Sequence, residues 1–134
     1  MEPNAIAPPR RSAIEVVWRQ VVAGVTTREA AHDWAVVWVE HAPDMSWPDD
    51  GMIEAGLLYL HGLDMTRVRD SPNLICHGGP GRYVLSEAEV AGRLEHWLKM
   101  CSEYDCDPEK FRQRALEKAR NTPEYRERAN RRSI

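Results

Sequence analysis

Three short segments of this chain pair a helix-capping residue with a glutamate three positions later, and they constrain the fold more than any other feature. The pairs are Ser12 with Glu15, Thr26 with Glu29, and Ser86 with Glu89. In such a capping box the hydroxyl accepts a hydrogen bond from a first-turn amide, and the glutamate accepts one from the amide of the capping residue. The three boxes therefore predict three helix starts.

Apolar residues follow the boxes at helical spacing, which supports the same interpretation. The stripe after the first box is Ile14, Val17, Trp18, Val21, Val22 and Val25. After the second box, Trp34 and Trp38 fall on one face with small and branched residues around them, so this helix is expected to be central and mostly buried. The helix after Ser86 is expected to bury Val90, Leu94 and Trp97.

Two further helices are predicted from other start signals. One begins near Asp49 or Asp50 and runs to Gly62, and another begins at Asp107-Pro108-Glu109, where proline suits the first helical position. Between them, residues 74–85 are compatible with a short β-hairpin around Gly78-Gly79-Pro80-Gly81, although two strands alone are only marginally stable.

The expected fold class is therefore mainly α: a compact bundle of about five helices with a short β-hairpin over residues 74–85. Three segments are expected along the chain. Residues 1–11 form a disordered N-terminal segment, residues 12–106 a helical domain, and residues 107–134 a basic C-terminal helical extension.

The charge is distributed unevenly. Between Arg28 and Arg67 there is no lysine or arginine, but there are eight carboxylates: Glu29, Asp33, Glu40, Asp44, Asp49, Asp50, Glu54 and Asp64. Residues 1–108 hold nine basic and seventeen acidic side chains, whereas residues 109–134 hold nine basic and four acidic ones. An acidic body of this kind repels nucleic acid and attracts a basic surface.

Targeting and redox signals are absent from the sequence. The three cysteines, Cys76, Cys101 and Cys106, form no disulfide framework, and residues 1–11 lack the apolar core of a secretory signal. No apolar run approaches the roughly 20 residues of a membrane span. The sequence predicts a cytoplasmic protein that needs no cofactor.

The segment His77-Gly78-Gly79-Pro80-Gly81 resembles the oxyanion-hole loop of α/β-hydrolases of the prolyl-iminopeptidase type. That chemistry also requires a G-x-S-x-G nucleophile elbow, which this chain lacks. The segment is interpreted as a glycine-rich turn, and the protein is not expected to be an enzyme.

His32, His41 and His61, with Asp33, Asp44 and Asp64, are candidate metal ligands, because imidazoles and carboxylates together suit zinc or iron. No H-E-x-x-H pattern places two of these ligands on one helical turn, and His32 and His41 would point to roughly opposite sides of a helix. The sequence therefore favours surface or structurally satisfied histidines, and no metal ligand is predicted.

The acidic segment contains the candidate partner-binding residues. Trp47 lies among acids and outside every apolar stripe, which is the composition of a protein–protein hot spot. Carboxylates around such an anchor speed association with a basic partner. The predicted interface comprises Asp33, Glu40, Asp44, Trp47, Asp49, Asp50 and Glu54.

Three segments carry a family resemblance: residues 26–35 with Trp38-Val39, residues 53–64, and residues 83–98. Through them, over roughly residues 12–100, the chain resembles small helical bacterial immunity proteins of polymorphic-toxin and contact-dependent growth-inhibition systems. The resemblance implies no catalytic residues. It implies an immunity (antitoxin) protein that binds a basic cognate toxin and occludes it. The kind of toxin expected first is a nuclease. The alternative is a small regulatory adaptor that contacts nucleic acid or a protein through its basic C-terminal helix.

Overall fold

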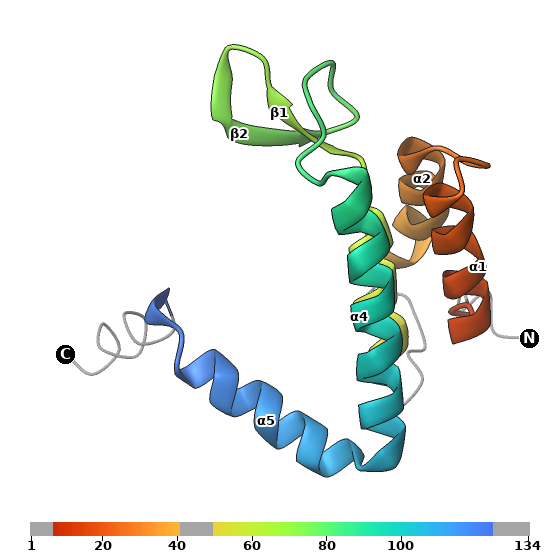
Figure 1. The fold of residues 1–134 in the computed structure, drawn as a ribbon, viewed down its shortest axis with the longest axis vertical. Helices are drawn as coiled ribbons and strands as arrows, with labels where there is room; N and C mark the ends of the chain where they lie inside the picture. Colours follow the sequence, from red (N-terminus) through yellow and green to blue (C-terminus); the bar gives the residue numbers. More distant parts are fainter. Residues whose placement is uncertain (1–6, 41–49, 125–134) are drawn as a thin grey trace, which may run out of the picture. The chain divides into compact units, whose positions relative to one another are not determined.

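The computed structural model describes residues 7–40 and 50–124. Five helices and one two-stranded antiparallel sheet follow one another along the chain (Figure 1). They are α1 (Arg11–Val22), α2 (Arg28–Val39), α3 (Gly51–His61), β1 (Met65–Val68), β2 (Ser71–His77), α4 (Glu87–Cys106) and α5 (Pro108–Arg120). The predicted fold class, mainly α with a short hairpin, is confirmed.

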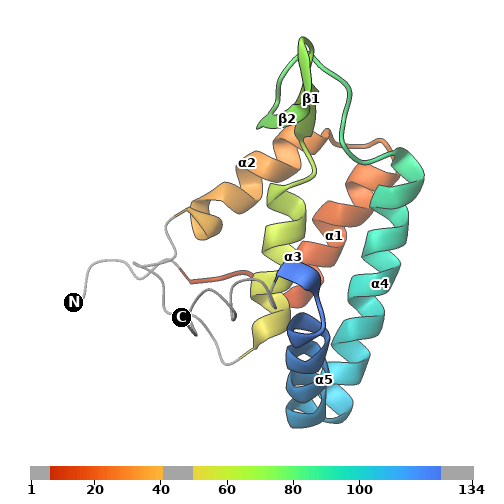
Figure 2. The same cartoon turned by 90° about the vertical axis from the view of Figure 1, so that its left-hand side faces the viewer.

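The chain forms two compact units, Met1–Leu98 and Lys99–Ile134, and the boundary between them falls within α4. The first unit contains α1, α2, α3, the hairpin and the first part of α4. Figure 2 shows α1 and α3 beside each other, with the hairpin beyond the ends of these helices. In the second unit, the rings of Tyr104 and Phe111 meet edge to face at 5.8 Å, and α5 has no buried residue.

Of the three predicted capping boxes, only the one at Ser86 forms as predicted. Ser86 and Glu89 form both reciprocal hydrogen bonds, each at 3.1 Å. In α2 the capping residue is Thr27 rather than Thr26, and its hydroxyl accepts from the Ala30 amide. The box at Ser12 was predicted wrongly: α1 already begins at Arg11, and its N-cap, Arg10, makes no side-chain capping bond. Asp50 and Asp107 cap α3 and α5.

Two tryptophans from distant helices form the centre of the first unit. Trp18 of α1 and Trp97 of α4 are fully buried and stack with ring centroids 5.8 Å apart. Each indole N–H has a buried acceptor: Trp18 donates to the Val90 carbonyl at 3.1 Å and Trp97 to the Met52 carbonyl at 3.0 Å. The largest fully buried aliphatic side chains of the described residues are Ile14, Leu57, Leu60, Leu63 and Leu94.

The expectation that α2 is mostly buried around Trp34 and Trp38 was wrong. Both rings are only half-buried, and the buried residues of this helix are Arg28, Ala31 and Ala35. Small residues on the inner face allow α2 to approach its neighbours closely. The two tryptophans therefore lie to one side, where their rings meet edge to face at 4.9 Å and Trp38 donates to the Ala7 carbonyl.

The hairpin lies earlier than residues 74–85. β2 pairs with β1: residues 75–77 pair with residues 65–67, Ser71 pairs with Val68, and the loop is Arg69-Asp70. Of the predicted second strand, only Tyr83 forms a bridge, to Thr66 on the other side of β1. The turn at Arg69-Asp70 thus reverses the chain before the glycine-rich segment does. Within the described residues, no helix is long and apolar enough to cross a membrane.

Candidate metal centre

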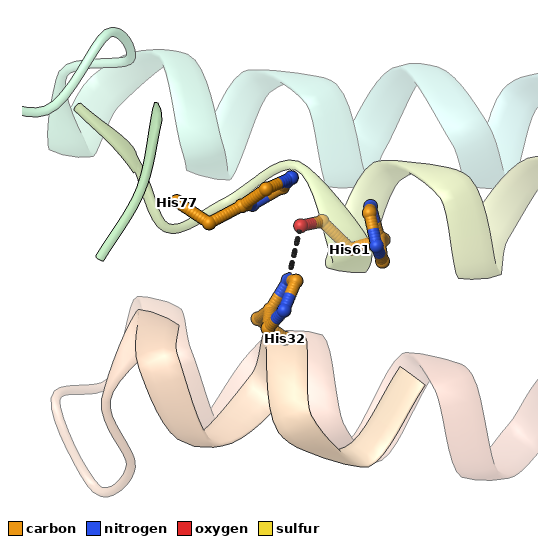
Figure 3. A group of neighbouring side chains, drawn as sticks. All are labelled: His32, His61 and His77. Atoms are coloured by element: carbon orange, nitrogen blue, oxygen red, sulfur yellow. Dashed lines mark hydrogen bonds between the residues drawn. The ribbon is translucent and has the colours of Figure 1, made fainter. Parts of the chain in front are cut away.

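Three histidines from three different elements lie close together in the first unit (Figure 3). His32 lies in the middle of α2, His61 is the last residue of α3, and His77 is the last residue of β2. Their ring centroids are 4.4 to 4.7 Å apart, and one ligating atom from each residue lies within 4.8 Å of the others. The cluster therefore depends on how α2 crosses α3 and on where β2 ends.

The glycine-rich segment after β2 holds His77 in place. Gly78 has a φ of +63°, a conformation that favours glycine, and its amide donates to the Asp64 carbonyl at 3.0 Å. A Cβ on Gly79 would lie 2.6 Å from the Cys76 sulfur and 2.8 Å from the Thr66 hydroxyl. The glycine-rich segment is not the hairpin turn that the sequence predicts, but it packs closely against Asp64, Thr66 and Cys76.

Hydrogen bonds assign the proton positions on two of the rings. His32 Nδ1 lies 2.7 Å from the His61 carbonyl oxygen, which can only accept, so Nδ1 is the donor. His77 Nδ1 lies 2.6 Å from Asp64 Oδ1 and donates to that carboxylate. In the neutral form of each ring, Nε2 therefore carries the lone pair that a metal ion requires.

His61 presents a buried nitrogen with no hydrogen bond. Its Nε2 has no hydrogen-bond partner within the described residues, and the nearest carboxylate oxygen, on Glu40, is 3.6 Å away. Burial lowers the pKa of His61 below its usual 6.5, and positive charge on His32 and His77 lowers it further, while Glu40 opposes the shift. The neutral ring, the form that binds metals, is thus favoured at pH 7.

Asp64 is the charged group of the cluster and is almost completely buried, with 3% of its surface exposed. Besides its bond to His77, its Oδ1 lies 3.3 Å from His32 Nδ1. A carboxylate that receives the second ring N–H of a ligating histidine fixes the tautomer and raises the basicity of the ligand. Asp64 occupies this supporting position for His77, whereas the Nδ1–H of His32 is donated to the His61 carbonyl.

The donor set determines which ions the cluster suits. Imidazole nitrogens bind zinc, copper, iron and nickel, whereas magnesium and calcium require oxygen ligands. Tetrahedral zinc with bonds of about 2.0–2.1 Å needs nitrogens about 3.3 Å apart. The ligating nitrogens lie within 4.8 Å of one another, so each pair would have to approach by at most about 1.5 Å to bind zinc. Three histidines leave a fourth coordination position available.

The structure describes four of the seven predicted partner-binding residues. Asp33 and Glu54 are exposed, on α2 and α3 respectively, and Glu40 is exposed beside His61. Asp50 is engaged within the fold: it caps α3 through the Met52 amide, and Arg11 binds both of its oxygens at 2.8 and 3.0 Å. Asp44, Trp47 and Asp49 lie outside the described residues, as does His41.

Sequence reasoning considered three members of the cluster, His32, His61 and Asp64, but predicted no metal ligand. It missed His77, because that residue was assigned to a glycine-rich turn. The three histidines come from a helix centre, a helix end and a strand end. No characteristic sequence spacing relates such positions, so no motif identifies them. The available signal was the pair His77-Gly78, since a histidine just before a turn glycine is held at the end of a strand.

The chain was compared with protein-family models, with curated proteins and with solved structures, and none of them matches it.

Proposed function

We propose that this protein binds a divalent transition-metal ion, with His32, His61 and His77 as ligands and Asp64 as a supporting carboxylate. The observation that carries the proposal is the buried His61 Nε2, which has no hydrogen-bond partner in the described chain although two other imidazoles lie beside it. A buried polar atom without a partner is costly, and a metal ion at this position would remove that cost.

The role of the metal follows from the origin of its ligands. β2 is exposed along nearly its whole length, so the hairpin buries little apolar surface of its own. Two strands without such burial are marginally stable. An ion bound by His77 together with His32 and His61 would tether the hairpin to α2 and α3. The ion binds the folded chain and not the unfolded one. A free ion concentration a hundred times the dissociation constant would therefore add about 2.7 kcal/mol to the free energy of unfolding.

Metal titration of the full chain tests the proposal. Zn²⁺ binding is measured by calorimetry on metal-free protein, and Co²⁺ absorption reports tetrahedral nitrogen coordination. We expect His32→Gln, His61→Gln and His77→Gln each to weaken Zn²⁺ binding more than Asp64→Asn does. Loss of a supporting carboxylate costs about 10- to 100-fold in metal affinity.

His96→Gln is the matched control, because His96 is exposed on α4 and outside the cluster. Its Zn²⁺ affinity should equal that of the unaltered protein. Equal weakening by His96→Gln, or unchanged affinity in all three ligand variants, would show that Zn²⁺ binds elsewhere on the chain.

A second candidate function is the immunity activity, favoured by the uneven charge. Asp33 and Glu54 are exposed and make no ion pair within the described ranges, so both remain available to a basic partner. We infer that a basic toxin domain, such as a nuclease, would associate with this acidic body by electrostatic attraction. The basic C-terminal extension would instead serve the adaptor function.

The two acids allow a direct test against a toxin domain encoded beside this protein. Asp33→Lys combined with Glu54→Lys should slow association and reduce its salt dependence, with a smaller effect on dissociation. Glu87→Lys, at an exposed acid near the start of α4, is the control. Equal association rates for the double variant and the unaltered protein would exclude this surface as the interface.

A further inference from the structure

One hollow at the hairpin is lined by every lysine and arginine of a long acidic segment of the sequence. Between Arg28 and Arg93 the chain has only three basic side chains, Arg67, Arg69 and Arg82. All three line one hollow of about 380 Å³, together with Val68, Pro72, Pro80 and Gly81. Every lining residue belongs to the first unit, and none belongs to the histidine cluster.

The backbone around this hollow is closely packed. The Arg67 amide donates to the Arg82 carbonyl at 2.8 Å, which brings the 78–86 segment against β1. A Cβ on Gly81 would lie 1.7 Å from the Arg67 carbonyl oxygen, so only glycine permits this approach. The β1–β2 register shifts between Arg67 and Val68. Such bulges redirect side chains and are common beside functional sites.

The charge in the hollow is of one sign. None of its lining residues is acidic, and within the described chain the three guanidinium groups make no ion pair. Arg67 Nη1 donates to the Pro72 carbonyl at 3.2 Å, which orients that guanidinium group without neutralising it. Neighbouring like charges repel each other, so an anion that enters the hollow relieves this repulsion.

We propose that this hollow binds a phosphate group through Arg67, Arg69 and Arg82. The planar guanidinium group of arginine can donate two parallel hydrogen bonds to phosphate oxygens. A phosphate dianion also neutralises the charge of several guanidinium groups better than a carboxylate monoanion does. A volume of about 380 Å³ falls within the range of small-molecule sites and leaves space for a group attached to the phosphate.

The acidic composition of the chain restricts what can carry the phosphate. Eight carboxylates lie between residues 29 and 66 of the sequence, and a chain of this composition repels an extended polyanion such as a nucleic acid. A small phosphate ester or the headgroup of a phospholipid presents a single phosphate group without that penalty. The ligand is therefore a phosphomonoester-type anion, either free or on a lipid.

The test uses the full chain, freed of metal so that phosphate cannot bind through an ion. Inorganic phosphate is titrated at constant ionic strength while backbone amide NMR shifts are followed, with acetate as the matched monoanion. We expect saturable shifts at Arg67, Arg69 and Arg82 with phosphate, and much weaker ones with acetate. Arg82→Gln and Arg69→Gln should each weaken phosphate binding about tenfold or more, because each removes a charge-assisted hydrogen bond.

Arg93→Gln is the control, because Arg93 belongs to the same unit but does not line this hollow. Its phosphate affinity should be unchanged. Arg82→Gln should weaken phosphate binding while leaving Zn²⁺ binding in place, which separates this proposal from the metal centre. Equal loss in Arg93→Gln, or full phosphate affinity in both Arg69→Gln and Arg82→Gln, would overturn the proposal.

A vesicle arm identifies the source of the phosphate. Phosphatidylcholine vesicles with and without phosphatidic acid are sedimented with the protein. Binding that requires phosphatidic acid and is lost in Arg82→Gln assigns the site to a lipid headgroup. Binding of inorganic phosphate without vesicle binding assigns it to a free anion. Absence of both overturns the proposal.

Discussion

His61 is the residue on which the candidate metal centre most depends, because its position at the end of α3 buries one ring nitrogen without supplying a partner. Two neighbouring imidazoles and burial all disfavour its charged form. The same environment that prepares His61 to bind a metal ion makes its protonation unfavourable for the folded protein.

The pH dependence of His61 follows from this shift. Because its pKa is lowered in the folded state, the unfolded chain binds the proton first as pH falls below about 6.5. Stability should therefore be independent of this group above that value and decrease as pH falls toward the folded pKa. In NMR titration of the metal-free protein, the His61 ring should titrate below 6.5 when folded and near 6.5 in urea.

His61→Gln should remove this part of the pH dependence of the free energy of unfolding, whereas His96→Gln, at an exposed position, should leave it in place. A folded-state midpoint for His61 above 6.5 would contradict the burial argument.

At the scale of elements, the close approach of α3 to its neighbours depends on a missing side chain. A Cβ on Gly56 would lie 2.8 Å from the Trp97 ring and 3.0 Å from the Ile14 side chain. Glycine inside a helix costs about 1 kcal/mol relative to alanine. Glycine is nevertheless required at this position, because the stacked tryptophans occupy the space that a Cβ on Gly56 would need.

Two glycine substitutions separate helix propensity from packing. Gly92→Ala, on α4, meets no atom within 4 Å and should stabilise the protein by about 0.5–1 kcal/mol. Gly56→Ala gains the same propensity but overpacks the core, and overpacking costs about 1–3 kcal/mol, so we expect a net loss of stability. Urea denaturation of both variants measures the difference. A stabilised Gly56→Ala would show that Trp97 moves without strain.

At the scale of the whole molecule, both proposed binding sites belong to the first unit, Met1–Leu98. The second unit holds the basic helix α5, which buries none of its residues. The charge asymmetry of the sequence thus coincides approximately with a structural division. This division allows the functions proposed for the two parts to be tested separately.

Removal of residues 107–134 is the test. Because α5 has no buried residue, we expect Zn²⁺ affinity to be unchanged and the free energy of unfolding of the first unit to change by no more than about 1 kcal/mol. Calorimetry and urea denaturation measure the two quantities. Under the adaptor alternative, the truncated chain would lose its partner. A large fall in Zn²⁺ affinity would instead tie the metal centre to the C-terminal extension.

The sequence by itself determined the mainly helical fold, the starts of α4 and α5, and the burial of Trp18 and Trp97. These features depend on local signals, since a cap acts within one helical turn and an apolar stripe within one helix. Even so, the second tryptophan stripe, Trp34 and Trp38, was placed in the core wrongly, because small residues on the other side of α2 packed more closely.

Only the tertiary structure decided which polar side chains meet. His32, His61 and His77 come from three elements, and their meeting depends on the crossing of α2 with α3 and on the register of β1 with β2. The same register, with the close approach at Gly81, gathers Arg67, Arg69 and Arg82. A one-residue slip would turn the side chains of a strand to the opposite face. No local pattern encodes this pairing, because it is set by long-range packing.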